Sequence, residues 1–556
     1  MTEKSGFFIR WACVLIIIAF ALSACAVRQT QTGINGMVTD EIVFPMQEGA
    51  SLTYWVPLHA NALPIINSFS ETEWYKELEK LTGVKVDFIH PVSGQEREQL
   101  NVMLASRDLP DIIENTFENY SGGIIKAGSD GLVIDLKDLH KKYAPNLMKL
   151  YEMYPELLLD IETDEGAILR VPFIRGHDNL RTFRGLVVRN DWLGDLGLSA
   201  PETIDEWYSM LSAFKEIKGA TVPFLTSTNE LKRDYGFVGA FGINNSYFAE
   251  NGKIVYGPAD PRYKDFLATL NRWYKEGLIY SELALSSNTK VNDALVVNGQ
   301  VGSMMTILGG GVGKYIELMK DIDPEFDLLA TPYPTLQKGE IPKFIHQDPT
   351  VYHAGSASVT SSCKTPEIAL AWLDYGYSKE GNMIHNFGIE GISYEMVNDY
   401  PEYTEIITNN PDGVPMATIG HKYCRAFAQG PFVQDERYLE QYLNLPQQIK
   451  AIEVWTKYAD EVNKVNTKVY GELNPQESSK ITPMQVEITT YVDEMFLKFV
   501  LGREPLDKFD EYTSRIRQLG IDEIIKIKQT AYDRFISKFP QAKELKSINA
   551  IEFYRR

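Results

Sequence analysis

The stretch Leu308–Tyr315 (LGGGVGKY) is the nearest approach to a phosphate-binding loop in this sequence. A Walker A loop needs a glycine five residues before the glycine of its Gly-Lys pair and a hydroxyl residue after the lysine. Those positions hold Leu308 and Tyr315, so neither requirement is met. The sequence also lacks a G-x-S-x-G elbow, an H-E-x-x-H motif, a C-x-x-C pair and an EF-hand loop. It therefore predicts a protein without catalysis, cofactor or metal.

The first 25 residues have the pattern of an export signal. Lys4 and Arg10 form a basic segment before an apolar run, Trp11 to Leu22. This run is too short to span about 30 Å of hydrocarbon. The sequence Leu22-Ser23-Ala24-Cys25 then resembles the lipobox of bacterial lipoproteins, in which a diacylglycerol is attached to the cysteine thiol and the chain is cut before it. We predict a lipoprotein signal peptide at 1–24, a palmitate-type lipid anchor on Cys25 and a flexible tether over 25–49. The alternative is a plain signal peptide in which Cys25 is incidental.

The charge balance argues against a nucleic-acid partner. Lys and Arg number 55 against 75 Asp and Glu, a net charge of −20, whereas nucleic-acid binding needs a basic surface. Removing 1–24, which carries a net charge of +1, leaves −21. Two further cysteines, Cys363 and Cys424, lie in the body; in an exported protein they could pair or stay as free thiols.

Strands and helices alternate from Ser51 onward. The pattern predicts strands at 51–57, 84–89 and 109–113, with helices at 70–82 and 95–107 between them. This β-α-β-α-β order is typical of an α/β sheet.

Several residue pairs predict where helices begin. Ser70 with Glu73, and Thr203 with Glu206, have the spacing of capping boxes. Thr365-Pro366 and Thr482-Pro483 place an N-cap residue before a proline at the first helical position.

Longer segments carry a family pattern. They are LTYWVPL (52–58), YKELEKLTGVKVDFIHP (75–91), GQEREQLNVMLASRDLPDIIE (94–114), RNDWLGDLGLSAPETIDEWY (189–208), FLATLNRWYKEGLI (266–279), VVNGQVGSMM (296–305), ALAWLDYGYSKEG (369–381), NFGIEGISYEM (386–396) and ITPMQVEITTYVDEMFLKFVLGREPLDKFDEY (481–512). Together they resemble the family 1 extracellular solute-binding proteins, and more narrowly the long lipoprotein subgroup that serves carbohydrate ABC transporters. The resemblance covers roughly 50–535.

This resemblance implies an α/β fold of two hinge-connected lobes, like that of the periplasmic binding proteins. Carried over by chain order, the segments that cross between lobes are expected near 172–188, 345–355 and 395–430. The N-terminal lobe would then comprise 50–175 and 355–420, and the C-terminal lobe 180–350 and 425–556.

The sequence departs from the subgroup at one loop. Many members carry a calcium loop of the D-x-N-x-N-G-x-x-D-E kind, but here the chain reads FKEIKGATVPF (214–224). Calcium needs six to eight oxygen ligands, and this loop offers one carboxylate, Glu216. We expect no metal there.

Ligand contacts are expected outside the carboxyl ends of the strands and at the crossings. Sugar hydroxyls suit Asp, Glu, Asn and Arg, and the apolar faces of sugars suit aromatic rings. For each aromatic residue core packing stays the alternative, and Trp273 and Trp372, in amphipathic helices, are predicted to be core. The predicted contacts are Trp55, Glu114, Asn115, Phe117, Arg175, Asp178, Tyr247, Gly310, Asp348, Tyr352 and Tyr394.

Three functions are considered. The leading one is a monomeric lipoprotein, anchored to the outer face of the cell membrane, that binds an oligosaccharide and delivers it to the transmembrane subunits of an ABC permease. The second is a protein of the same fold that presents its ligand to a membrane histidine kinase. The third, a secreted glycan-active enzyme, is disfavoured by the missing motifs. The identity, length and charge of the sugar stay open.

Overall fold

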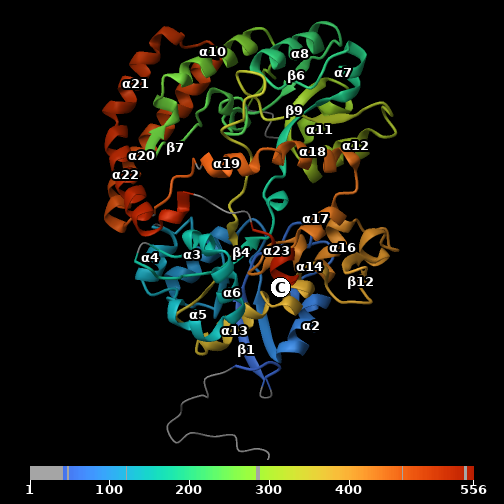
Figure 1. Cartoon of the computed structure of the whole chain (residues 1–556), viewed down its shortest axis with the longest axis vertical. Helices are drawn as coiled ribbons and strands as arrows, with labels where there is room; N and C mark the ends of the chain where they lie inside the picture. Colours follow the sequence, from blue (N-terminus) through green and yellow to red (C-terminus); the bar gives the residue numbers. More distant parts are fainter. Residues whose placement is uncertain are drawn as a thin grey trace, which may run out of the picture. The chain divides into compact units, whose positions relative to one another are not determined.

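Two separate β-sheets, each covered by helices, make up the body of the chain (Figure 1). The computed structural model describes residues 42–46, 49–120, 122–163, 165–283, 289–465, 467–471, 473–543 and 548–555. The predicted signal peptide, Cys25 and nearly all of the tether lie outside these residues. Everything below concerns the unit formed by residues 44–556.

The six-stranded sheet defines what we call the first lobe, and its strand order is β14-β4-β11-β3-β1-β2. Strands β1, β2 and β3 are parallel, whereas β11 runs antiparallel to β3 and β4. The strands are β1 (Ala50–Trp55), β2 (Val84–Ile89), β3 (Ile112–Glu114), β4 (Val171–Arg175), β11 (Val351–Val359) and β14 (Val433–Gln434). A hairpin, β12 (Tyr394–Val397) and β13 (Tyr400–Tyr403), is added to this lobe. Its helices are α2 (Glu73–Thr82), α3 (Glu96–Ser106), α4 (Gly123–Ser129), α5 (Lys137–Tyr143), α6 (Pro145–Met153), α13 (Pro366–Tyr375), α14 (Lys379–Phe387), α15 (Glu405–Thr408), α16 (Met416–Tyr423), α17 (Glu436–Tyr442) and α23 (Ala550–Arg555).

The four-stranded sheet defines the second lobe, with the order β10-β5-β9-β6. Its strands are β5 (Arg184–Arg189), β6 (Val222–Leu225), β9 (Val301–Ile307) and β10 (Leu328–Ala330), and a hairpin pairs β7 (Tyr247–Glu250) with β8 (Lys253–Tyr256). Its helices are α7 (Asn190–Leu196), α8 (Ile204–Glu216), α9 (Thr228–Leu231), α10 (Arg262–Lys275), α11 (Thr289–Val297), α12 (Lys314–Met319), α18 (Pro446–Thr456), α19 (Ala459–Val465), α20 (Pro475–Val500), α21 (Phe509–Gln518) and α22 (Ile521–Lys538). None of the helices in the described ranges combines the length and apolarity needed to cross a bilayer.

Each lobe has its own hydrophobic core. Trp273, on α10, is 1% exposed in the core of the second lobe, and Trp372, on α13, is 5% exposed in that of the first. The prediction that both are core residues is confirmed. Two cores joined by a few connecting segments allow the lobes to move as units.

Segments of the chain connect the two sheets at several places. Residues 176–183 lead from β4 to β5, and residues 331–350 lead from β10 to β11. A third connection follows β14, which pairs with β4 before the chain continues through α17 to α18. It therefore leaves the first lobe later than the range 395–430 that we expected. After α22 the chain returns to the first lobe, where the Ala550 amide donates to the Gly176 carbonyl at 2.8 Å. We call 176–183 and 331–350 the crossing segments.

The observed first residues of the helices can be compared with the capping boxes and N-cap-proline pairs predicted from the sequence. The capping box of Thr203 and Glu206 is confirmed at the start of α8, and Thr365 with Pro366 begins α13 as predicted. The box of Ser70 and Glu73 is wrong. A short 3-10 turn, Phe69–Glu71, uses Ser68 as its cap and buries Phe69, so α2 begins only after Thr72.

Thr482-Pro483 does not begin a helix either. Pro483 lies inside α20, which begins at Pro475 after a capping box of Asn474 and Glu477. The same signal, an N-cap residue before a proline, therefore occurs twice in this stretch, at Asn474-Pro475 and at Thr482-Pro483. The helix begins at the earlier pair because Glu477 completes the capping box of Asn474.

Candidate ligand-binding site

A buried charged network lies at the carboxyl ends of β1 and β3. One Arg425 amino group donates to both carboxylate oxygens of Glu114 at 2.9 Å, and the Tyr54 hydroxyl donates to Glu114 at 2.7 Å. The side chains of Glu114 and Arg425 are each only 6% exposed. Burial raises the pKa of the Glu114 carboxyl, and the Arg425 charge opposes that shift. The network therefore stabilises the interior of the first lobe beneath these strand ends and does not itself offer a surface to a ligand.

Two histidines lie close to this network. His59, which follows β1, and His421, on α16, stack with ring centroids 5.0 Å apart. Burial and the Arg425 charge lower the pKa of His59; burial, His59 and Arg425 lower that of His421 to about 3. Both rings are therefore neutral at pH 7. Asn115 caps the next turn, where its side chain accepts a hydrogen bond from the Phe117 amide at 2.8 Å.

The corresponding edge of the second lobe is formed by β6 and β9, which run parallel. Arg184, opposite the end of β9, lies 3.8 Å from Glu230, which follows β6. Burial raises the pKa of Glu230, with Arg184 and Arg233 opposing the shift. The π-helical turn Leu308–Gly313 follows β9 and leaves Gly310 exposed. This edge offers a cation, a carboxyl group and accessible backbone.

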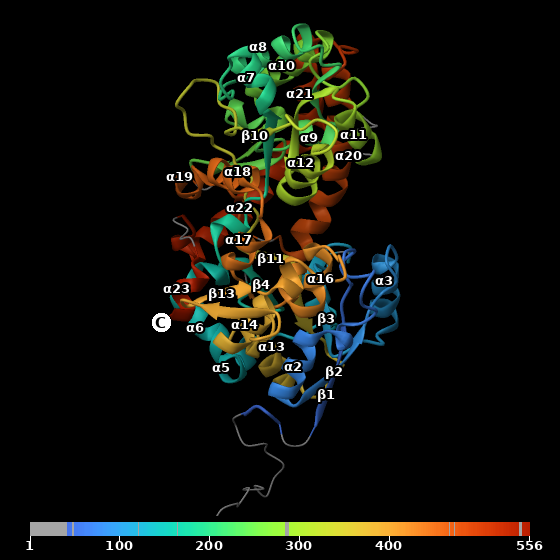
Figure 2. The same ribbon diagram turned by 90° about the vertical axis from the view of Figure 1, so that its right-hand side faces the viewer.

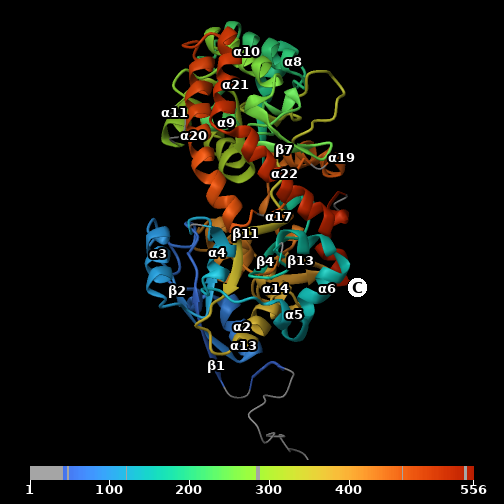
Figure 3. The ribbon, with the colours of Figure 1, turned by 90° about the vertical axis from the view of Figure 1, so that its left-hand side faces the viewer.

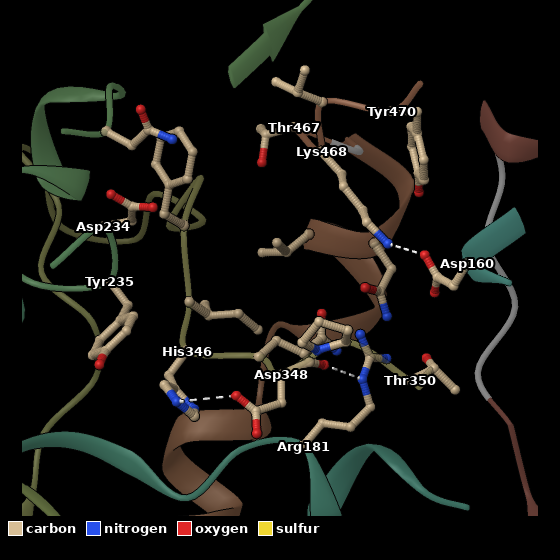
Figure 4. A pocket seen from close by; sticks show the side chains of 18 of the residues that line it. Asp160, Arg181, Asp234, Tyr235, His346, Asp348, Thr350, Thr467, Lys468 and Tyr470 are labelled. Carbon is tan, nitrogen blue, oxygen red and sulfur yellow. Dashed lines mark hydrogen bonds and ion pairs between the residues drawn. The ribbon is translucent and has the colours of Figure 1, made fainter. Parts of the chain in front are cut away.

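A cavity of about 520 Å³ lies between the lobes, beside the crossing segments (Figure 4). Its walls come from the 3-10 turn Pro155–Asp160 in the first lobe, from second-lobe residues near β7, from the crossing segments, and from α19 and the loop after it. The lining residues are Glu156, Leu157, Leu159, Asp160, Arg181, Arg233, Asp234, Tyr235, Asn244, Tyr247, Lys343, Phe344, Ile345, His346, Gln347, Asp348, Pro349, Thr350, Val462, Asn463, Thr467, Lys468, Val469 and Tyr470. We call it the hinge cavity.

Ionic contacts hold the walls of the hinge cavity together. Lys468 donates to Asp160 at 2.5 Å, which ties the loop after α19 to the first lobe. Arg181 donates to the Asp348 carbonyl at 2.8 Å, and so ties one crossing segment to the other (Figure 4). The Asp348 carboxylate accepts from Arg175 at 3.3 Å. Burial raises the pKa of Asp348, against the charges of Arg175 and Arg181.

The hinge cavity and the two strand edges use different residues. None of its lining residues belongs to segments 56–60, 115–120, 226–230 or 308–313, which follow the carboxyl ends of β1, β3, β6 and β9. Helix α19, which lines the cavity, lies on the opposite side from α3 and α11 in both side views (Figures 2 and 3). The hinge cavity is therefore lined by residues other than those that directly follow these strand ends, although the charge of Arg184 reaches His346 in its wall.

A family model described as bacterial extracellular solute-binding protein matches residues 68–383. The chain belongs to this family.

Two relatives illustrate the relationship. This solute-binding protein is 23% identical over 552 residues to the fructooligosaccharide ABC transporter substrate-binding protein FusA of Streptococcus pneumoniae, covering 95% of this chain and 98% of FusA. It is 28% identical over 350 residues to lipoprotein LipO of Bacillus subtilis, covering 60% of this chain and 66% of LipO.

Solved structures establish the fold. The crystal structure of the alginate-binding protein AlgQ2 without calcium ion matches with a TM-score of 0.68 at 24% identity, over 88% of this chain and 99% of that one. Streptococcus pneumoniae FusA in complex with kestose matches with a TM-score of 0.68 at 19% identity, over 88% and 100%. The predicted two-lobe α/β fold of this solute-binding protein is confirmed.

The predicted contact residues are distributed over several places in the solute-binding protein. Tyr247 and Asp348 line the hinge cavity, and Arg175 contacts it through Asp348. Asp178 forms an ion pair with Arg181 at 2.7 Å. The Arg175 guanidinium lies over the Tyr352 ring, 5.1 Å from its centroid. Asn115 directly follows the buried Glu114 at the first-lobe edge, and Gly310 lies in the turn after β9 at the second-lobe edge.

Three predicted aromatic contacts lie in hydrophobic clusters. Trp55 is 2% exposed and Phe117 is fully buried, both in a cluster with Leu100 and Leu104. Tyr394, the first residue of β12, is 6% exposed in another cluster. Their role as ligand contacts stays a prediction, and their burial favours the alternative of core packing.

The sequence did not single out most residues of the hinge cavity. Asp160, Arg233 and Lys468 come from segments without a recognisable motif, and only the folded chain brings them together. Arg181 and His346 lie within the ranges expected for the crossings, which is the one signal that could have selected them.

Two expectations from the sequence, on metal ligands and on the cysteines, concern the described residues. No group of three or more His, Cys, Asp or Glu side chains there is arranged to hold a metal ion. Cys363 is half-buried and Cys424 buried, and both are free thiols. Of the two alternatives for these cysteines, the structure has the unpaired one.

Proposed function

We propose that this protein is a lipid-anchored receptor on the outer face of the cell membrane that captures an oligosaccharide between its lobes and delivers it to an ABC importer. The observation that carries the proposal is the pair of strand edges. In each lobe polar side chains lie near the carboxyl ends of parallel strands, and segments crossing between the sheets join the lobes. Ligands of open α/β sheets bind outside such carboxyl ends.

The chemistry of the two edges suits a sugar. Arg184 and Glu230 offer a donor and an acceptor for hydroxyl groups, and Gly310 offers backbone without a side chain in the way. The neutral imidazole of His59 adds a ring face and a hydrogen-bonding nitrogen on the first lobe. Relatives named for fructooligosaccharide, for polygalacturonan and rhamnogalacturonan, and for melibiose, raffinose and stachyose support a carbohydrate ligand.

Capture works by closure of the lobes around the ligand. A ligand that contacts both edges binds the closed arrangement better than the open one, and so shifts the population towards it. The permease then distinguishes the loaded receptor from the empty one by its shape. No bond of the ligand is made or broken, which agrees with the absence of catalytic motifs from the sequence.

The proposal is tested by a melting-temperature screen of the mature protein against kestose, raffinose, oligogalacturonates and alginate oligomers. A true ligand at 100 times its Kd adds about 2.7 kcal/mol to the free energy of unfolding, and should be recovered chemically intact. Arg184→Met should then raise the Kd roughly 10- to 150-fold, since a hydrogen bond to a charged group contributes about 1.5–3 kcal/mol. Arg272→Met, on an exposed face of α10, is the control and should bind as wild type. Stabilisation by none of these sugars, or wild-type affinity in Arg184→Met, would contradict the proposal.

The anchor is tested separately. Cys25→Ala removes the thiol that the lipid needs, so the protein should accumulate in the medium or unprocessed in cells. Metabolic labelling with an alkyne fatty acid measures the modification. Cys363→Ala is the matched control, because it removes a half-buried thiol of the body and should leave labelling unchanged. Equal labelling of Cys25→Ala and wild type would refute the lipid anchor.

A further inference from the structure

We propose that the hinge cavity is a second binding site, for a small uncharged polyhydroxyl molecule such as a mono- or disaccharide, and that its occupation opposes closure of the lobes. The site itself is independent of the proposed function. Its effect on capture rests on that function.

The size and charge of the cavity select this class of ligand. A volume of about 520 Å³ is within the range of small-molecule pockets, roughly 300–1,000 Å³. Its formal charges balance, because four cationic side chains face four carboxylates. These residues are Arg181, Arg233, Lys343 and Lys468 against Glu156, Asp160, Asp234 and Asp348. A balanced lining gives an ion of either sign no net attraction, whereas a molecule with many hydroxyl groups can use the donors and the acceptors together.

Unsatisfied polar groups in the wall point to an occupant. His346 is 7% exposed, and its Nδ1 has no hydrogen-bond partner in the structure. The buried side-chain nitrogen of its neighbour Gln347 has none either. Buried polar atoms are nearly always paired, because an unpaired one costs about 1–3 kcal/mol. Hydroxyl groups pair with an imidazole and with an amide equally well.

The imidazole of His346 is held in a fixed position. The rings of Phe183 and Tyr235 pack edge-on against it, with centroids 4.6 and 4.8 Å away. Burial, and then the charges of Arg184, Arg233 and Arg175, lower its pKa to about 3. The ring is therefore neutral and can accept or donate one hydrogen bond at Nδ1.

Arg233 adds a cation that is free to bind. It is exposed at the cavity wall, and within the described ranges it has no ion-pair partner. Its neighbour Asp234 accepts a hydrogen bond from the Asn245 amide at 3.2 Å and is held within its own lobe. Arg233 can therefore donate to ligand oxygens without breaking a contact.

The position of the cavity couples it to lobe movement. Asp160 on the first lobe and Lys468 on the loop after α19 meet at its wall, and Lys538 on α22 lies 3.4 Å from Glu162 nearby. In both side views α19 lies on the opposite side of the molecule from α3 and α11 (Figures 2 and 3). A rotation of the lobes about the crossing segments that closes the strand edges would therefore move these walls apart. An occupant that contacts both walls stabilises the present arrangement, and by linkage it weakens capture at the edges.

Saturation-transfer NMR of the mature protein with glucose, galactose and sucrose at millimolar concentration measures binding to the cavity. His59→Ala, which removes the imidazole that follows β1 at the first-lobe edge, should keep the signal. Thr467→Trp places an indole in the cavity, where the Thr467 side chain lies in its wall (Figure 4), and should abolish the signal. Thr490→Trp, on an exposed face of α20, is the control and should keep it. Binding of none of the three sugars, or a signal lost in His59→Ala and kept in Thr467→Trp, would overturn the proposal.

A second variant guards against misfolding of Thr467→Trp. Gln347→Met keeps the length of the side chain and removes the unpaired amide nitrogen, so it should weaken binding of the small sugar about 5-fold. Unchanged binding in Gln347→Met would count against the site.

The coupling is measured as the Kd of the captured oligosaccharide with and without the small sugar. Saturating small sugar should raise that Kd roughly 5- to 150-fold in wild type, the usual size of such coupling. In Thr467→Trp it should have no such effect. If the effect persists in that variant, the small sugar competes at the strand edges, and the cavity is not the site.

Discussion

Arg425→Met is expected to lower the free energy of unfolding by about 3–5 kcal/mol. The substitution leaves the Glu114 carboxylate buried without its cation, and an uncompensated buried charge costs this much. Both side chains are 6% exposed, so water cannot replace the guanidinium. Chemical denaturation at pH 7.5 measures the loss.

Two comparisons separate the ion pair from general damage. Glu114→Gln combined with Arg425→Met removes both charges and keeps an acceptor for the Tyr54 hydroxyl, so it should recover most of the stability. Lys76→Met breaks an exposed pair on α2 and should cost less than about 1 kcal/mol.

The pH dependence of Arg425→Met has a definite sign. In the folded variant, burial raises the pKa of Glu114 above its unfolded value, so the folded state binds a proton more readily. The stability gap to wild type should therefore narrow as the pH falls from 7.5 towards 5. A gap that widens on acidification would show that the carboxyl is not the source of the loss.

Trp55→Ala is expected to destabilise the protein by about 3–5 kcal/mol, as truncation of a buried tryptophan does. Trp55 is 2% exposed and packs with Leu100, Ile113 and Phe117. Oligosaccharide affinity of the remaining folded protein should stay near wild type. Denaturation and calorimetry on the same sample measure the two effects.

The opposite outcome has equal weight as a test. If Trp55 contacts the ligand, as its place at the end of β1 suggests from sequence, Trp55→Ala should raise the Kd roughly 5- to 150-fold with stability unchanged. Trp55→Phe keeps most of the aromatic volume and should lose much less stability than the alanine variant. That pair of variants distinguishes packing from recognition.

The sequence alone predicted the local features of this protein. The alternation of β1, α2, β2, α3 and β3 followed from hydrophobic periodicity, and β2 begins and ends at Val84 and Ile89 as expected. The capping box at Thr203 followed from residues three positions apart. Even local signals failed where a neighbouring segment competed, as when buried Phe69 held a 3-10 turn at the start of α2.

Membership of the solute-binding family was also predicted from sequence, because its segments extend over nearly the whole body. The sequence did not predict which of the proposed contact residues lie close together in the folded protein. Trp55, Glu114 and Phe117 stand at the expected strand end, yet all three are buried. Position along a strand selects an edge, but the depth of a side chain depends on the helices that cover that edge.

Only the tertiary structure decided the long-range pairs. Glu114 meets Arg425 across 311 positions, and Asp160 meets Lys468 across 308. Helix caps and hydrophobic periods act over three or four residues, so they determine elements one at a time. The hinge cavity arises from two lobes and the segments between them, and its balanced charges come from residues that no local rule connects. The sequence by itself therefore determined the elements, the export signal pattern and the family, while the packing of the two lobes decided which side chains share a site.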